Sequence, residues 1–544
     1  MFRTFCRVRQ VTGKQTNNLG TFLATVKRMQ SNAHTIPVRT VYEDDENDLK
    51  DAEDVHTEPL VEDNRTPIIE CKRKEFNFYK GTTLKKFDTI PIASQGWHHL
   101  KSKGDYFTIY PDIEDDHNEL LDEEGTTFEQ LGIGPEVQQI VKNLGFEQPT
   151  NIQKIAIPQI LSGQNTIIQA ETGTGKTLTY LLPIIDQILR WKRLLPDRRP
   201  NSPLALILVP SRELVLQVGT EVKKLANDLD ISVQTLIGGR TKKIMRNPTV
   251  KNVDILIGTV GVTSKVTTTR IYKLNEVRHT VLDEAHALFH ETFDEKLSIF
   301  LRRINFGFKQ NVSVNNTPGS SQLTMASATM PEKLPDYLDK CLNMASIVPI
   351  QTQNIHRVLV PQKFWRLGAL QKPAALLKFV KPRALRKEGT IIFSNNAATA
   401  DWVSIFLNQM NVKTVALNGN HPVEIRRDKY WDFRNGRVHI LSTTNSSGRG
   451  LDTITVDCVI NYDFPMNTAD YIHRCGRTGR VGSKSAGRVI NFICRPLEID
   501  LTKKIERAAR RGRALPIFDY QEQLQEKAMD AELKQLLESA PKDE

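Results

Sequence analysis

At 544 residues the chain is too long for a single hydrophobic core, so two or three domains are expected. Its hydrophobic content of 39% and charged content of 25% are typical of globular proteins, and no apolar run approaches the roughly 18 residues that would span a bilayer. The net charge of +11 favours a polyanionic partner such as nucleic acid, with solubility alone as the alternative reason for it. Six widely spaced cysteines without a C-x-x-C pair argue against a metal knuckle and against a disulfide framework.

The amino-terminal 42 residues contain seven basic residues and no acidic one. Phe, Val, Leu, Ser and Thr are interleaved with them, which is the composition of a mitochondrial transit peptide. The alternative is a disordered basic arm that touches RNA directly. We therefore predict that residues 1–42 direct the protein to the mitochondrial matrix.

Residues 43–125 form an extension that is acidic in its first part and of mixed charge in its second part. Between 43 and 63, eleven carboxylates accompany the single Lys50, which predicts a solvated spacer. Residues 64–125 mix a basic cluster with aromatic side chains, and contact of this cluster with RNA is an open alternative. The extension as a whole is predicted to be largely flexible.

A phosphate-binding loop follows at residues 170–177, which read AETGTGKT between an apolar run with strand character and the start of a helix. In this context glycines let backbone N–H groups surround phosphate oxygens, and the helix directs its positive end at them. We predict that Lys176 reaches the β- and γ-phosphates and that the Thr177 hydroxyl holds Mg²⁺. The predicted nucleotide-binding residues are Ala170, Glu171, Thr172, Gly173, Thr174, Gly175, Lys176 and Thr177.

Upstream of this loop, Phe146 and Gln153 predict that the nucleotide is ATP. A glutamine side chain has an acceptor and a donor side by side, which complement the edge of adenine. Phe146 can stack on the base. Pro149 and Thr150 are also typical of an ordinary helix start. The block indicates adenine binding only because a phosphate-binding loop follows it.

Apolar strand signals at residues 204–209, 253–257, 279–282 and 323–326 each end in polar residues. The carboxyl ends of parallel strands are where an open α/β sheet gathers its ligands. At one such end Asp283 is predicted to orient Mg²⁺ through its waters, and Glu284 to position and deprotonate the attacking water.

After a polar linker at residues 351–357, a second set of alternating strand and helix signals begins. It predicts a second parallel sheet within residues 358–515, and a charged helical tail over residues 516–544. The strand signals lie at residues 389–394, 414–417, 438–443, 458–462 and 488–493.

The ordered motifs over residues 126–498 resemble those of DEAD-box RNA helicases of superfamily 2. The resemblance implies an α/β chain of two tandem RecA-like domains, residues 126–350 and 358–515, each a mostly parallel sheet flanked by helices. The matching blocks are residues 145–153 (Q motif), 170–177 (motif I), 210–217 (Ia), 238–239 (glycine doublet), 283–286 (II), 327–329 (III), 448–452 (V) and 473–480 (VI).

By the same resemblance, Arg477 and Arg480 reach across to the γ-phosphate and Asp452 meets the ribose. His286, Ser327 and Thr329 link nucleotide state to domain closure. ATP and Mg²⁺ are the implied cofactors, and RNA is the implied partner, held mainly through its sugar–phosphate backbone. The residues expected to contact RNA are Pro210, Arg212, Gly238, Gly239, Thr259, Arg426 and Thr444.

The chain departs from the family pattern at His286, which replaces an aspartate, at Val260 and Val262, and at Asn445. A non-catalytic, non-unwinding RNA clamp or scaffold is therefore one alternative. A DEAH-type translocase is disfavoured by Gln153.

Within the family the chain is similar to the animal mitochondrial helicase linked to large-ribosomal-subunit assembly. This predicts a monomer that remodels structured rRNA, with ribosome assembly factors as partners and no membrane contact.

A fluorescent reporter fused to residues 1–42 is expected to enter mitochondria, because this segment has seven basic residues and no acidic one. Microscopy and protease protection of isolated organelles measure the import. Replacing the basic residues of the segment by glutamine supplies the control and should leave the reporter in the cytosol. Cytosolic fluorescence from the unaltered fusion would contradict the prediction.

Overall fold

The computed structural model describes two lobes and the segment that precedes them. The predicted transit peptide, the acidic spacer, residues 353–357 of the linker and the carboxyl-terminal tail lie outside the described residues, as do Thr172, Gly239 and Asp452. Within the described ranges, no helix has both the length and the apolar character that a membrane crossing requires. Those ranges are 66–82, 90–111, 125–171, 173–195, 198–238, 245–247, 250–289, 291–306, 313–314, 317–331, 334–352, 358–448, 455–480 and 485–515.

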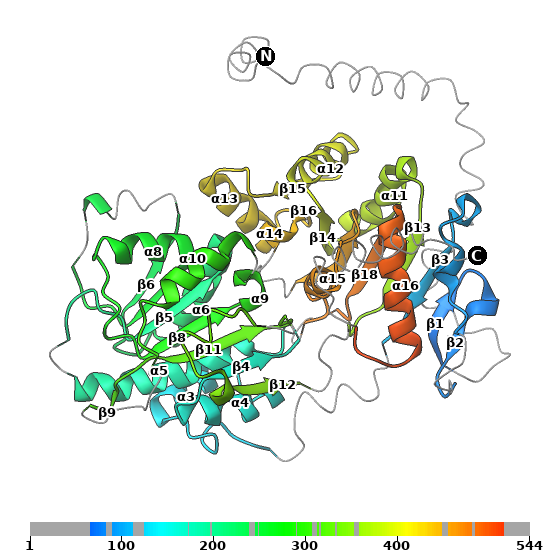
Figure 1. Cartoon of the computed structure of the whole chain (residues 1–544). Helices are drawn as coiled ribbons and strands as arrows, with labels where there is room; N and C mark the ends of the chain where they lie inside the picture. The colour runs from blue at the N-terminus through cyan, green and yellow to red at the C-terminus, as the bar shows by residue number, and fades with distance from the viewer. Residues whose placement is uncertain are drawn as a thin grey trace, which may run out of the picture. The chain divides into compact units, whose positions relative to one another are not determined.

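The first lobe contains a seven-stranded sheet in the order β12-β4-β11-β8-β5-β7-β6, and all of its pairs are parallel (Figure 1). Consecutive parallel strands need crossover helices, which is why strand and helix alternate along the sequence. The strands are β4 (Thr166–Gln169), β5 (Ala205–Val209), β6 (Val233–Leu236), β7 (Ile255–Thr259), β8 (His279–Asp283), β11 (Gln322–Ser327) and β12 (Val348–Gln351).

Both faces of this sheet are covered, because successive strand residues point to opposite sides. Ile207 and Val209 of β5 join one core with α3, α4, α5 and α6, whereas Leu206 and Leu208 join the other core with α8, α9 and α10. Double coverage explains the continuous apolar run of β5. The helices are α3 (Pro135–Asn143), α4 (Asn151–Leu161), α5 (Lys176–Leu194), α6 (Arg212–Leu225), α8 (Val260–Thr268), α9 (Ala285–Leu288) and α10 (Glu291–Leu301).

The second lobe contains a nine-stranded sheet in the order β15-β16-β14-β17-β18-β13-β3-β1-β2. Its pairs from β15 to β13 are parallel, as the sequence predicted for this lobe. The elements are β13 (Gln362–Arg366), α11 (Lys372–Leu385), β14 (Gly389–Ser394), α12 (Ala397–Gln409), β15 (Thr414–Leu417), α13 (Val423–Arg434), β16 (Ile440–Thr444), α14 (Asn445–Gly448), β17 (Val456–Asn461), α15 (Thr468–Cys475), β18 (Arg488–Ile493) and α16 (Pro496–Arg510).

The last three strands of this sheet come from the amino-terminal extension. Strands β1 (Pro67–Cys71), β2 (Phe78–Tyr79) and β3 (Tyr106–Ile109) pair antiparallel, with β3 bound to the edge of β13. The prediction that residues 43–125 are largely flexible is therefore wrong for this part. Its strands are too short to be recognised locally, and they gain stability from the lobe, because the Phe107 ring stacks on that of Phe364 with centroids 4.8 Å apart.

A buried carboxylate fastens the extension to α16. Glu506 is fully buried and accepts hydrogen bonds from Ala93 N at 2.7 Å, Ser94 N at 3.0 Å and Ser94 Oγ at 2.7 Å. Arg510 Nη2 donates to the same carboxylate at 2.8 Å and to the Phe76 carbonyl at 2.7 Å. Each polar group at this contact thus has a partner, as burial requires.

Glu506→Ala is expected to destabilise the second lobe by about 3–5 kcal/mol, because it leaves Arg510 and the two backbone donors buried without their acceptor. Chemical denaturation and limited proteolysis of the extension measure the effect. Arg507→Ala changes an exposed residue of the same helix and should shift stability by no more than about 0.5 kcal/mol. Equal stability of both variants would show that the extension is not fastened here.

Candidate active site and RNA-binding surface

The phosphate-binding loop connects β4 to α5, as predicted. Gly173 and Gly175 adopt φ of +94° and +92°, which L side chains rarely reach. Lys176 Nζ donates to the carbonyls of Ala170 and Glu171 at 2.7 and 2.6 Å. Burial lowers the pKa of Lys176, and the nearby carboxylates of Glu284 and Asp283 oppose that shift. The lysine is thus held inside the loop, close to the two acidic residues of motif II.

Gln153 connects the predicted adenine-reading block to this loop. Its Oε1 accepts from Thr150 N at 2.9 Å, which completes a capping box at the start of α4, and its Nε2 donates to the Gly175 carbonyl at 3.4 Å. Thr150 Oγ1 donates to the Thr174 carbonyl at 2.9 Å. Phe146 is 44% exposed, which leaves a face open for stacking. The block therefore positions the loop, and both polar atoms of the buried Gln153 amide are engaged in doing so.

Thr177 and Asp283 provide the hydroxyl and carboxylate oxygens that suit Mg²⁺. Tyr180 of α5 donates to Asp283 Oδ2 at 2.9 Å. Burial, and secondarily the charge of Glu284, raises the pKa of Asp283 well above its ordinary value. A desolvated carboxylate of this kind is one whose charged form a divalent cation would stabilise, so the donor set fits the predicted ion.

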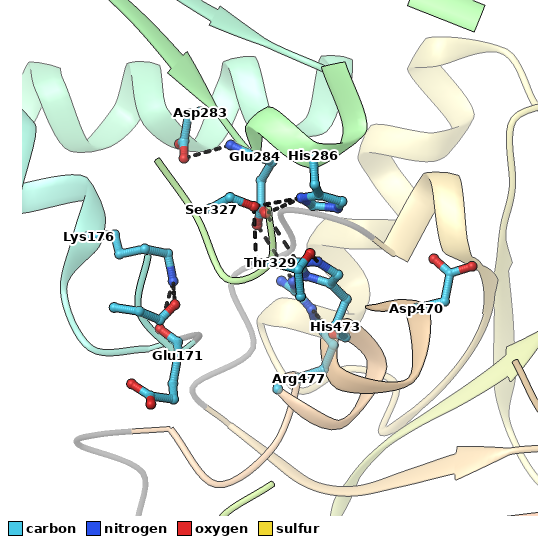
Figure 2. Close-up of polar contacts among 12 residues, drawn as sticks. Glu171, Lys176, Asp283, Glu284, His286, Ser327, Thr329, Asp470, His473 and Arg477 are labelled. Atoms are coloured by element: carbon cyan, nitrogen blue, oxygen red, sulfur yellow. Dashed lines mark hydrogen bonds and ion pairs between the residues drawn. The ribbon is translucent and has the colours of Figure 1, made fainter. Parts of the chain in front are cut away.

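Motifs II and III of the first lobe meet motif VI of the second in one polar cluster (Figure 2). His286 Nδ1 shares a 2.8 Å hydrogen bond with Ser327 Oγ, and Thr329 Oγ1 shares one of 2.9 Å with His473 Nε2. The rings of His286 and His473 stack, with centroids 3.9 Å apart and planes 16° apart. His286 therefore joins a hydrogen bond within its lobe to a ring contact with the other lobe.

Both arginines expected to cross between the lobes lie at the nucleotide-binding elements. Arg477 Nη2 is 3.9 Å from Glu284 Oε1, and the Arg477 side chain is almost fully buried. A Cβ placed on Gly173 would lie 3.2 Å from Arg480 Cγ, so Arg480 packs directly on the loop. The second lobe thus brings Arg477 close to Glu284 and Arg480 onto the phosphate-binding loop.

Glu284, His286 and His473 also offer ligand atoms that lie within 4.8 Å of one another. Because the two imidazole rings are stacked, their in-plane lone pairs run side by side and do not converge on one ion. Thr177 and Asp283 remain the better pair for Mg²⁺.

The residues expected at RNA follow neighbouring strands of the first sheet. Pro210, Gly238 and Thr259 stand at the carboxyl ends of β5, β6 and β7, which are adjacent in the sheet. The Arg212 guanidinium lies against Gly238, where a Cβ would meet it at 2.9 Å. Gly238 therefore allows the arginine to cross this edge.

Thr444 and Arg426, the two residues of the second lobe that are expected to contact RNA, lie in different surroundings. Thr444 ends β16 and is 7% exposed. Arg426 Nη1 is 3.1 Å from Glu213 Oε1 of α6, and both side chains are nearly buried. Arg426 thus forms an ion pair between the lobes in this arrangement, a role that the sequence did not predict.

Comparison with known proteins assigns the family. Residues 150–337 match the DEAD/DEAH box helicase model, and residues 371–482 match the helicase conserved C-terminal domain. The Mus musculus protein named probable ATP-dependent RNA helicase DDX28 is 35% identical over 465 residues, covering 82% of this chain and 85% of its own. The Homo sapiens protein of the same name is 34% identical over 462 residues, with the same coverage of both chains. The chain belongs to the DEAD-box family of RNA helicases.

The fold of the helicase agrees with this assignment. The structure of S. cerevisiae Dbp5 bound to RNA and ADP BeF3 superposes with a TM-score of 0.59 and 26% sequence identity, covering 70% of this chain and 93% of that one. The two tandem RecA-like domains predicted from the sequence are confirmed. The helicase is an RNA-dependent ATPase that binds ATP and RNA.

Three positioning contacts in the helicase had no sequence signal. Tyr180, which holds Asp283, lies in the buried apolar run of α5, and Glu213, which holds Arg426, lies in the first turn of α6. Thr352 Oγ1 donates to Glu171 Oε2 at 2.8 Å, which connects the residue after β12 to the phosphate loop. Only a search for polar residues at otherwise buried helix positions could have suggested Tyr180.

His286→Ala is expected to lower RNA-stimulated ATP turnover by about tenfold, because it removes both the bond to Ser327 and the ring contact to His473. His286→Phe keeps the ring contact alone, and His286→Asn keeps a hydrogen-bonding group alone. A double-mutant cycle with Ser327→Ala measures the coupling, expected to be at least about 0.5 kcal/mol. Additive effects, with ATP binding unchanged throughout, would show that His286 does not act through Ser327.

Proposed function

We propose that the helicase acts as an ATP-driven clamp that remodels structured RNA, and that its hydrolytic site is complete only when the lobes meet. The observation that carries this proposal is the approach of Arg477 to within 3.9 Å of Glu284, from opposite lobes. Glu284 activates the water, and Arg477 and Arg480 stabilise the charge on the transferred phosphoryl group. An arginine in this role is worth on the order of 10³–10⁵ in rate.

The remaining roles are carried over from the family's motifs. Lys176 and the loop residues 170–177 bind the phosphates, Phe146 and Gln153 the adenine, and Asp452 the ribose. Thr177 and Asp283 hold Mg²⁺, which neutralises phosphate charge when bound. Residues at the strand ends, together with one arginine of α6 and one of α13, contact RNA through its backbone, which gives little base preference. These contacts come from Pro210, Arg212, Gly238, Gly239, Thr259, Arg426 and Thr444.

The proposed place of action is the mitochondrial matrix, on rRNA of the large ribosomal subunit during its assembly. Support comes from residues 1–42, which have seven basic residues and no acidic one, and from likeness over 82% of the chain to the helicases named DDX28. The protein acts as a monomer beside ribosome assembly factors. Crosslinking in cells followed by sequencing should enrich mitochondrial large-subunit rRNA, and enrichment of cytosolic RNA alone would contradict the proposal.

ATP hydrolysis is expected to be stimulated by RNA and to prefer ATP over GTP, because the amide of Gln153 complements adenine and not guanine. Lys176→Ala should abolish turnover while it leaves nucleotide-free RNA binding nearly unchanged. Lys142→Ala, at an exposed position of α3, is the matched control and should hydrolyse ATP normally. Phosphate release and strand displacement are measured together. Turnover without displacement would favour a non-unwinding clamp, and equal use of GTP would remove the adenine-reading role.

A further inference from the structure

Two basic segments, about 430 residues apart in the sequence, meet on the second lobe. The first is residues 72–80 of the extension, and the second is residues 503–513 at the end of α16. Arg510 joins them, because its Nη2 donates to the Phe76 carbonyl at 2.7 Å and its guanidinium lies 5.6 Å from the centre of the Phe78 ring. Figure 1 shows α16 beside β1 and β3.

Nearly all the charge in these segments has one sign. Together they contain ten basic residues and two acidic ones, Glu75 and Glu506. Glu506 is fully buried and bound to Arg510, so it adds no negative charge to the surface. Five of the exposed basic residues define what we call the composite basic surface: Lys72, Lys74, Arg507, Arg511 and Arg513.

Three basic residues at the end of α16 lie along one side of the helix. Lys504, Arg507 and Arg511 recur at spacings of three and four, so they lie along one side of the helix, while Glu506 and Arg510 point to the extension. Arg73 is held at 3.0 Å by Asp105 and contributes less. The three basic side chains of α16 therefore lie on a different side of the helix from the buried contact with the extension, and Lys72 Nζ donates to the Gly104 carbonyl at 3.2 Å.

The composite basic surface is separate from the RNA residues between the lobes. Those of the second lobe stand on β16 and α13, near one edge of the sheet, whereas β1 lies near the other edge. Six strand spacings separate β16 from β1, which corresponds to roughly 30 Å. A short strand held between the lobes does not need to reach it.

We infer that the composite basic surface binds the phosphate backbone of RNA that flanks the strand in the cleft, with duplex or folded RNA as its ligand. Charge complementarity supports this, since exposed Lys and Arg neutralise phosphates without reading bases. The inference rests on RNA binding between the lobes and adds a second site, which would keep the helicase on a structured RNA through successive openings of the clamp. The extension is then a folded RNA-binding element of the second lobe.

The test compares two RNAs, a short oligo(U) and the same oligo(U) joined to a hairpin, with full-length protein and with Lys72→Glu/Lys74→Glu/Arg511→Glu/Arg513→Glu. The variant should bind the hairpin RNA at least tenfold more weakly. Its log–log salt dependence for the hairpin RNA should be shallower by roughly 3 to 4, since each of the four lost duplex phosphate contacts removes about 0.9. Its affinity for oligo(U), and its maximal ATPase rate at saturating oligo(U), should remain those of the unaltered protein.

The matched control reverses four other exposed basic residues of the lobe: Lys381, Arg386, Lys413 and Arg437. It carries the same net charge, so equal weakening by both variants would mean general electrostatics and would overturn the inference. Unchanged hairpin affinity in the first variant would also overturn it, as would equal weakening for both RNAs. Loss of ATPase stimulation by oligo(U) in the unaltered protein would instead contradict the proposed function, which keeps the two failures distinct.

Discussion

The carboxylate of Glu284 is surrounded by groups from both lobes, and the organisation of the site depends on this constraint. Arg477 and His473 of the second lobe lie 3.9 and 4.0 Å from it, and His286 of the first lobe lies 3.6 Å from it. A carboxylate that contacts both lobes responds to their separation. In the proposed function, hydrolysis is thereby coupled to contact between the lobes.

The departures from the family pattern become understandable at this interface. The aspartate that His286 replaces could offer two oxygens, whereas the imidazole offers one bond to Ser327 and adds a ring contact to His473. Asn445 accepts from Arg474 Nε at 2.6 Å, so a neutral amide carbonyl helps to hold a buried guanidinium. Val262 lies on the buried side of α8 and is a packing residue. The non-catalytic scaffold suggested by these substitutions is not required, because each of these three side chains has a structural use.

The second lobe is larger than the motif pattern implies. Its sheet continues through β3, β1 and β2, and the fully buried Trp97 and Glu506 make the added segment part of the core. Arg366 donates to the Trp97 carbonyl at 3.0 Å and to the carbonyls of Ile493 and Cys494, which secures the same junction from the β13 side. The extension thereby fixes exposed cations relative to α16, which a flexible segment would not do.

Sequence alone determined the phosphate loop, the acidic pair at the end of β8, the two parallel sheets and the arginines of residues 473–480. Each is a short motif whose function follows from backbone geometry and residue chemistry within a few positions. Only the tertiary structure decided that Arg426 pairs with Glu213, that Tyr180 holds Asp283, and that the extension joins the second sheet. The Glu506 contact to Ala93 spans 413 positions, and such contacts leave no local period or spacing. They arise from complementary burial of polar groups once both cores have formed, which no window of the sequence can display.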